Sequence, residues 1–154
     1  MFLEYQLVPQ TTIKPRSFVG LMALYESNFL RLLQLIPELE QLDGCFRSRI
    51  AGDCDLHVSI LERSRYTVTL SLTYLFDLPD GKVADPDMTV RVYLDGRLAE
   101  SMSFSGQPVH EELRRLAKTD GRALGARWKR NVVLNKWLEY LIDQGHLVLD
   151  RSPA

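Results

Sequence analysis

Residues 86–104 constrain the fold of this chain more than any other stretch. Two runs rich in β-branched and apolar residues flank Asp95-Gly96, a dipeptide typical of β-hairpin turns. The two strands of a hairpin are adjacent and antiparallel, so the chain is expected to contain an antiparallel sheet.

Two registers are compatible with this hairpin, and they place different residues on each face. A two-residue Asp95-Gly96 turn pairs Arg91 with Glu100 across the strands. A three-residue turn over 94–96 puts the glycine in the left-handed position of a bulge and aligns most apolar residues on one face. We favour the three-residue turn because apolar matching sets strand register. It leaves Glu100 on the apolar face, where its carboxylate needs an arginine or backbone donors as a partner.

Three further segments have the pattern of strands. Residues 66–76 alternate apolar side chains with threonine and serine, as expected for an antiparallel strand with one buried face. Residues 56–61 alternate in the same way, and residues 45–50 (CFRSRI) are interpreted as a short edge strand. Residues 77–87 are acidic and contain two prolines and a glycine, which predicts a loop.

Two segments have the apolar spacing of amphipathic helices. In the first, residues 18–36, apolar side chains recur every three or four positions, and Ser17 is a candidate N-cap. The second covers 128–144 and should stop at Gly145. Asn28 lies at the edge of the first apolar stripe, so we interpret it as part of a helix flank in water.

These elements predict an α+β fold in two layers, with both helices on one face of an antiparallel sheet of four to five strands. The expected organisation is a loosely ordered arm over 1–16, a single domain over 17–149 and a tail over 150–154. The length of 154 residues fits one domain with a sizeable core.

Composition excludes several classes of function. The net charge of −1 gives no general attraction to nucleic acid or to an anionic membrane. No apolar run reaches the ~18 residues of a membrane span, and the N-terminus lacks a basic region before its apolar residues. We therefore expect a cytoplasmic protein in which Cys45 and Cys54 are free thiols. No Cys/His spacing resembles a zinc site, and no metal or cofactor is predicted.

Residues 114–130 are the local exception to this neutral balance. They contain the basic residues Arg114, Arg115, Lys118, Arg122, Arg127, Lys129 and Arg130 and the single acid Asp120. A short helix over 109–118 is expected to lead into this segment. Basic side chains attract phosphates, and Trp128 could stack on a base, so RNA binding is an alternative function. A basic loop beside a helix is more often simply solvated, and nucleic acid is not the favoured partner.

Four runs resemble a known family: YESNFLRLLQLIP (25–37), ERSRYT (62–67), PDMTVRVYLDGRLAE (86–100) and NVVLNKWLEYLIDQG (131–145). They are similar to the YqiB-like proteins, a bacterial domain of unknown function. The resemblance spans most of the chain between the first and last helices and implies a small cytoplasmic bacterial protein. It supplies no activity and no catalytic residues.

The candidate ligand- or partner-binding residues are Glu62, Arg65, Arg91, Tyr93 and Glu100. Arg91 and Tyr93 stand two positions apart on one strand, so they share a face. Arginine offers a planar fork for phosphate or carboxylate, and tyrosine offers a flat ring with a hydroxyl. We therefore predict a binding or regulatory module that contacts a protein or an anionic small molecule.

A polar sheet face is expected to carry this site, with the basic loop as the other candidate surface. The face would comprise Ser59, Thr67, Thr69, Ser71, Thr73, Thr89, Arg91, Tyr93, Ser101 and Ser103, together with His57. The first alternative is a small enzyme acting on a phosphorylated metabolite or a nucleotide. It is not favoured, and no catalytic residue is predicted, because the chain has neither a phosphate-binding glycine loop nor a nucleophile elbow. The sequence gives no indication of the oligomeric state.

Overall fold

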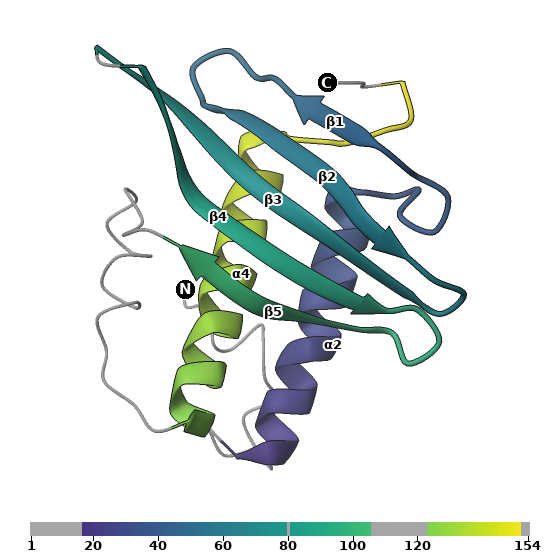
Figure 1. Ribbon diagram of the computed structural model, residues 1–154. Helices are drawn as coiled ribbons and strands as arrows, with labels where there is room; N and C mark the ends of the chain where they lie inside the picture. Colours follow the sequence, from purple (N-terminus) through teal and green to yellow (C-terminus); the bar gives the residue numbers. More distant parts are fainter. Residues whose placement is uncertain (1–16, 80, 106–122, 152–154) are drawn as a thin grey trace.

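A computed structural model describes residues 17–79, 81–105 and 123–151. Its elements, in chain order, are α2 (Phe18–Leu35), β1 (Cys45–Ser48), β2 (Asp55–Arg63), β3 (Thr67–Leu78), β4 (Gly81–Tyr93), β5 (Leu98–Ser105) and α4 (Ala123–Gln144). The strands form one five-stranded antiparallel sheet in the order β1-β2-β3-β4-β5. Both helices lie on the same face of this sheet, which confirms the predicted two-layer α+β architecture (Figure 1).

The ends of both helices follow local signals in the sequence. The Ser17 hydroxyl accepts a hydrogen bond from the Gly20 amide at 3.0 Å, which satisfies one of the free N–H groups at the start of α2. Helix α4 begins at Ala123, earlier than predicted, and is followed by Gly145 with a φ of 97°, a backbone conformation that favours glycine.

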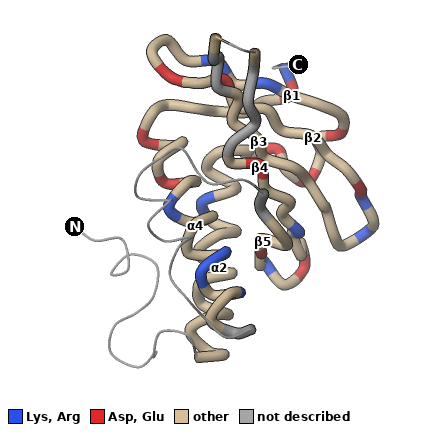
Figure 2. Tube along the Cα trace, turned by 60° about the vertical axis from the view of Figure 1, so that its left-hand side comes forward, with Lys and Arg blue, Asp and Glu red and all other residues tan. Residues whose placement is uncertain are grey.

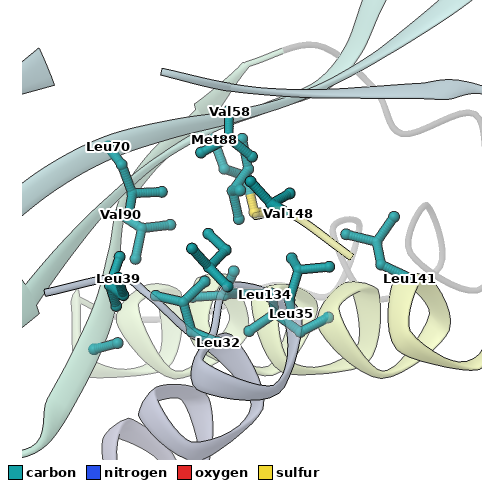
Figure 3. Packing of buried hydrophobic residues seen from close by; sticks show 14 of the residues in the cluster. Leu32, Leu35, Leu39, Val58, Leu70, Met88, Val90, Leu134, Leu141 and Val148 are labelled. Carbon is teal, nitrogen blue, oxygen red and sulfur yellow. The ribbon is translucent and has the colours of Figure 1, made fainter. Parts of the chain in front are cut away.

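The core fills the space between the two helices and the sheet (Figure 3). The side chains of Leu32 and Leu35 from α2 and Leu134 from α4 are completely buried. They meet equally buried strand residues such as Leu70 and Val90. Burial of each such side chain contributes about 1.5–3 kcal/mol, so the apolar helix stripes and the apolar strand faces together determine this layer arrangement.

The predicted acidic loop over 77–87 is wrong, because most of it belongs to β3 and β4. Strand β3 continues to Leu78 and β4 begins at Gly81. The register shifts between Thr73, which faces Asp87, and Leu75, which faces Ala84. The resulting bulge contains Pro86, and a bulge tolerates proline because its extra residue need not donate to the ladder.

The favoured three-residue hairpin turn is also wrong. Arg91 pairs with Glu100 and Tyr93 with Leu98, the register that a two-residue turn would give. The turn itself spans 94–97, and Arg97 rather than the glycine has a positive φ, of 57°. The Arg97 guanidinium lies 4.9 Å from the centre of the Phe29 ring, a cation–π contact that favours this conformation.

A bulge at Met102 explains why apolar matching misled the prediction. Ser101 faces Val90, whereas Ser103 faces Thr89, so Met102 is an extra residue of β5. A bulge reverses the faces of all later residues, and a single uniform register could not describe this hairpin.

The remaining expectations concern the cysteines, the segment after α4 and the residues outside the described ranges. Neither Cys45 nor Cys54 forms a disulfide, as predicted. Residues 146–149 follow α4 without forming a strand, and the Val148 amide donates to the Leu35 carbonyl at 2.9 Å. The arm over 1–16 and the helix over 109–118 lie outside the described residues.

Candidate functional site

A cross-strand row on the helix-free face of the sheet contains three of the five predicted site residues. Glu62 of β2 faces Thr69 of β3, Thr69 faces Arg91 of β4, and Arg91 faces Glu100 of β5. In the described part of the chain no helix or strand covers this face (Figure 1). The row is therefore accessible to a ligand or a partner.

A bulge at Leu61 places Glu62 in this row. The register of β2 shifts between Ile60 and Glu62, so Glu62 faces Thr69 and the next residue, Arg63, turns to the helix side. The guanidinium of Arg63 donates to the carbonyl oxygens of Leu39 at 2.9 Å, of Glu40 at 3.0 Å and of Leu42. One inserted residue thus assigns the glutamate to the open face and the arginine to the turns that follow α2.

Arg91, Tyr93 and Glu100 form the centre of the site. The Tyr93 hydroxyl donates to Glu100 Oε1 at 2.7 Å, and Arg91 Nε lies 3.5 Å from Thr69 Oγ1. Burial, followed by hydrogen bonding to Glu100, raises the pKa of Tyr93, and Arg91 opposes this shift. The partner of Glu100 is therefore a tyrosine rather than the expected arginine, and no ion pair joins Arg91 to Glu100 among the described residues.

Tyr25 from α2 approaches the same carboxylate and lies close to Arg127 and Arg130 of α4; sequence reasoning missed Tyr25, whereas both arginines belong to the basic segment it named. Burial and then the charge of Glu100 and hydrogen bonding to it raise the pKa of Tyr25 to about 12, while Arg127 and Arg130 lower it. Tyr25 lies on α2 and the two arginines on α4, so the cluster continues from the open face around the edge strand β5. The signal in the sequence was weak, because Tyr25 resembles any other residue of the apolar stripe.

Arg65 and Tyr66 occupy the turn beside the row. The Arg65 guanidinium lies 5.2 Å from the centre of the Tyr66 ring, and Tyr66 is half exposed. Within the described ranges, no ion pair links Arg65 to Glu62. Arg65 is thus a neighbour of the site and not part of its hydrogen-bonded centre.

Most of the predicted polar face is present, with one correction. Ser59, Thr69, Ser71 and Thr89 are partly exposed and alternate with buried apolar residues, as expected. Ser101 does not belong to the face, because it is almost fully buried on the helix side and its amide donates to Asn131. The Met102 bulge follows Ser101, so only the residues after it change faces.

Buried asparagines join the two helices to β5. Asn28, Asn131 and Asn135 are completely buried, which corrects the interpretation of Asn28 as a solvated flank. Buried amides require hydrogen-bond partners, and these side chains bond to one another and to the backbone of β5.

A second polar cluster lies near the C-terminal end of the described chain. His146 Nδ1 lies 2.9 Å from Ser48 Oγ, and His146 Nε2 lies 3.1 Å from Asp53 Oδ2. The Tyr74 hydroxyl also donates to Asp53, and burial together with this contact raises the pKa of Tyr74. Although a serine, a histidine and an aspartate are aligned, the histidine side chain is fully buried and Ser48 Oγ accepts the Leu147 amide. In this conformation no substrate could reach the serine, so we interpret the cluster as a structural latch.

The basic segment is only partly described. Arg127, Lys129 and Arg130 lie on α4, and the other four basic residues fall outside the described ranges. Elsewhere basic and acidic positions alternate over strands and loops, so no large region of one sign is evident along the described trace (Figure 2). In the described ranges no group of three metal-ligating side chains occurs, and no helix is long and apolar enough to cross a membrane.

Fold and site together define a small α+β protein whose antiparallel sheet has one face covered by helices and one polar, open face. The chain belongs to the family described as "Protein of unknown function (DUF1249)", whose model matches residues 31–147. This match includes the cross-strand row, all of α4 and the last turn of α2. No curated protein and no solved structure matches the chain.

Proposed function

We propose that the protein is a binding module that recognises an anionic group through the Arg91, Tyr93 and Glu100 centre on the open sheet face. The observation that supports this proposal is the convergence of these residues, with the Tyr93 hydroxyl on Glu100 at 2.7 Å and Arg91 directly opposite Glu100. The hydrogen bond fixes the hydroxyl of Tyr93 beside Arg91, so a ligand would meet an ordered pair of groups.

The balance of charge around Glu100 favours an anion. Arg91 on the sheet face and Arg127 and Arg130 beside Tyr25 contribute three positive charges, against the two negative charges of Glu62 and Glu100, which leaves one positive charge. An arginine fork suits the oxygen geometry of phosphate or carboxylate, and the Tyr93 ring offers an apolar surface beside it. A phosphorylated small molecule and an acidic protein segment share this chemistry.

A thermal-shift screen with inorganic phosphate, nucleotides and sugar phosphates tests the proposal, because a ligand that binds only the folded state raises the melting temperature. Wild-type protein should be stabilised by at least one phosphate compound. Arg91→Ala should weaken that binding about tenfold or more, since a charge-assisted hydrogen bond contributes roughly 1.5–3 kcal/mol. Its stability without ligand should change by less than about 1 kcal/mol, as expected for a partly exposed arginine.

Arg49→Ala is the matched control, because Arg49 is exposed and pairs with Asp55 at 3.3 Å outside the cross-strand row. It should bind as the wild type does. Equal binding by Arg91→Ala and the wild type would reject the site, and loss of folding in Arg91→Ala would show that the arginine is structural. A screen in which no phosphate compound stabilises the protein would favour an acidic protein partner.

We also propose that the protein is a cytoplasmic, YqiB-like bacterial protein. The runs at 62–67 and 86–100 support this assignment, and Cys45 and Cys54, which form no disulfide, fit a reducing compartment. Fractionation of producing cells tests the location, and recovery with the membrane or secreted fraction would contradict it.

A further inference from the structure

Arg91 and Glu100 carry opposite charges at directly opposite positions, but they do not form an ion pair. They are cross-strand partners of β4 and β5, and both side chains are partly exposed. Side chains in such positions have Cβ atoms about 4.5–5.5 Å apart, and opposite charges there attract each other. The ion pairs between described residues nevertheless include neither Arg91 nor Glu100. Another contact therefore keeps the two charged groups apart.

Tyr93 makes this contact. It pairs with Leu98, so it is the diagonal neighbour of Glu100, and an aromatic side chain can reach across such a diagonal. Its hydroxyl donates to Glu100 Oε1 at 2.7 Å. Burial and then the contact with Glu100 raise the pKa of Tyr93, whereas Arg91 lowers it, so the phenol is close to both charged groups. It is hydrogen-bonded to the negative one.

The Arg91 side chain reaches the neighbouring strand on the other side. Thr69 of β3 faces Arg91, and Arg91 Nε lies 3.5 Å from Thr69 Oγ1. Among the described residues, no hydrogen bond or ion pair occupies the two terminal nitrogens of Arg91. These nitrogens form the fork that binds the oxygens of a phosphate or a carboxylate, so the part of Arg91 that an anion needs is available.

The preference of Glu100 for the tyrosine has a physical cause. A hydrogen bond to a charged acceptor stabilises a protein more than an ion pair between partly exposed groups does. Tyrosine also has fewer rotatable bonds to fix than arginine. Without the Tyr93 hydroxyl, Glu100 Oε1 would lose its donor, and Arg91 stands directly opposite. Tyr25 also approaches Glu100, but a single phenol proton can satisfy only one of the two carboxylate oxygens.

We infer that Tyr93 is a positioning residue, whose hydroxyl keeps Glu100 from neutralising Arg91 and so leaves the arginine fork open to an anion. An Arg91 bonded to Glu100 would present a neutral pair whose donors are already used. The consequence for binding rests on the proposed anion site. The separation of Arg91 from Glu100 does not, because it can be measured without a ligand.

Double-mutant cycles in the absence of ligand test this separation. Arg91→Gln and Glu100→Gln are combined in the wild type and in Tyr93→Phe, and urea unfolding gives the coupling between them. The two substitutions should be nearly additive in the wild type. In Tyr93→Phe the ion pair forms, so the coupling should exceed that of the wild type by about threefold in the unfolding equilibrium constant. Equal coupling in both backgrounds would overturn the inference.

Tyr66→Phe is the matched control for these cycles. Tyr66 is a half-exposed tyrosine in the turn beside the row, and its ring contacts Arg65. Removal of its hydroxyl should leave the coupling between Arg91 and Glu100 as it is in the wild type.

Binding of inorganic phosphate, followed by thermal shift over a concentration series, tests the consequence. Tyr93→Phe should bind phosphate about tenfold more weakly than the wild type. Adding Glu100→Gln should restore binding to at least the strength of the wild type, because the carboxylate that captures Arg91 is then neutral. A merely structural role of Tyr93, or direct contact of its hydroxyl with the anion, gives no such rescue.

Two results with phosphate would overturn the inference: undiminished binding by Tyr93→Phe, or weakened binding that Glu100→Gln does not rescue. If the wild type binds no phosphate, the proposal of a phosphate site fails instead. The cycles without ligand then still decide whether Tyr93 separates Arg91 from Glu100.

Discussion

At the scale of single residues, Glu100 links the two layers of the molecule. Its carboxylate accepts the hydroxyl of Tyr93 on the open face, and its charge acts on Tyr25 in α2. Burial is the main cause of the raised pKa of each tyrosine, and the Glu100 carboxylate raises both pKa values further. Glu100 therefore couples the surface of the site to the helix beneath it.

A double-mutant cycle measures the Tyr93–Glu100 hydrogen bond. Tyr93→Phe and Glu100→Ala should each destabilise the protein by about 1–2 kcal/mol, because the bond involves a charged acceptor that is only partly exposed. The coupling energy from urea unfolding of both single variants and the double variant should be about 1 kcal/mol. Strictly additive effects would show that the bond contributes nothing in solution.

The raised pKa of Tyr25 predicts a loss of stability at high pH. The folded protein keeps the Tyr25 proton up to a pKa of about 12, whereas the unfolded chain releases it near the ordinary value of 10.0. The stabilisation that the raised pKa of Tyr25 gives the folded state is fully present below pH ~10. It is lost as the pH rises further, because ionisation of Tyr25 then favours the unfolded state. Between pH ~9 and ~11, wild-type protein should lose about 1 kcal/mol more stability than Tyr25→Phe.

Tyr66→Phe is the control for this titration, since Tyr66 is half exposed in the turn after β2. Urea unfolding at both pH values should show that Tyr66→Phe follows the wild type. The same pH dependence in Tyr25→Phe as in the wild type would mean that other groups cause the loss.

The positions of some single residues could be predicted from the sequence, and those of others could not. The pair Arg91 and Tyr93 could be placed on the polar face because strand alternation fixes which residues share a side. Asn28 could not be placed in the core, because a polar residue at the edge of a helical stripe is ordinarily solvated. Its burial depends on Asn131 and Asn135, which are distant in the sequence.

At the scale of elements, the strands and helices were predictable and the bulges were not. Alternation and helical spacing identified every described helix and most of the strands, because each element has one apolar side. Bulges at Leu61, Met102 and opposite Tyr74 interrupt that alternation by one residue each. A pattern that assumes a constant period cannot detect such an insertion, and so the hairpin register was mispredicted. The start of β4 was mispredicted because the prolines and the glycine of 77–87 were interpreted as loop signals.

The Leu61 bulge leads to a prediction about two arginines that stand two positions apart in the chain. Arg63→Ala should destabilise the protein by about 2–4 kcal/mol, because it removes donors for three carbonyl groups in the turns after α2. Arg65→Ala is the control and should cost less than about 1 kcal/mol, since Arg65 contacts the exposed Tyr66 ring. Chemical unfolding compares them, and equal losses would contradict the assigned faces.

At the scale of the whole molecule, the two-layer arrangement follows from the number of apolar faces. One apolar sheet face needs both amphipathic helices to cover it, which leaves the other face open, and this much was predictable from the sequence. The latch of Ser48, Asp53 and His146 was not predictable, because it joins positions that are 93 and 98 residues apart in the sequence. It attaches the segment after α4 to β1 and to the loop before β2.

His146→Ala tests whether this latch stabilises the entire fold. The substitution removes a fully buried side chain and a hydrogen-bond partner of both Ser48 and Asp53, so unfolding should require about 2–4 kcal/mol less. Leu147→Ala, at the next and exposed position, should change stability by less than about 0.5 kcal/mol. Guanidinium unfolding measures both, and a loss of the same small size in His146→Ala would contradict the latch.

The bulge at Leu61 also has a consequence for how this sequence can vary. The extra residue shifts the alternation of β2 by one position, so that odd- and even-numbered residues exchange faces of the sheet beyond it. Substitution at position 61 leaves that alternation intact, whereas the loss or gain of one residue between His57 and Thr69 reverses it. The number of residues in this interval, more than the identity of the one that protrudes, thus determines whether glutamate or arginine meets the solvent.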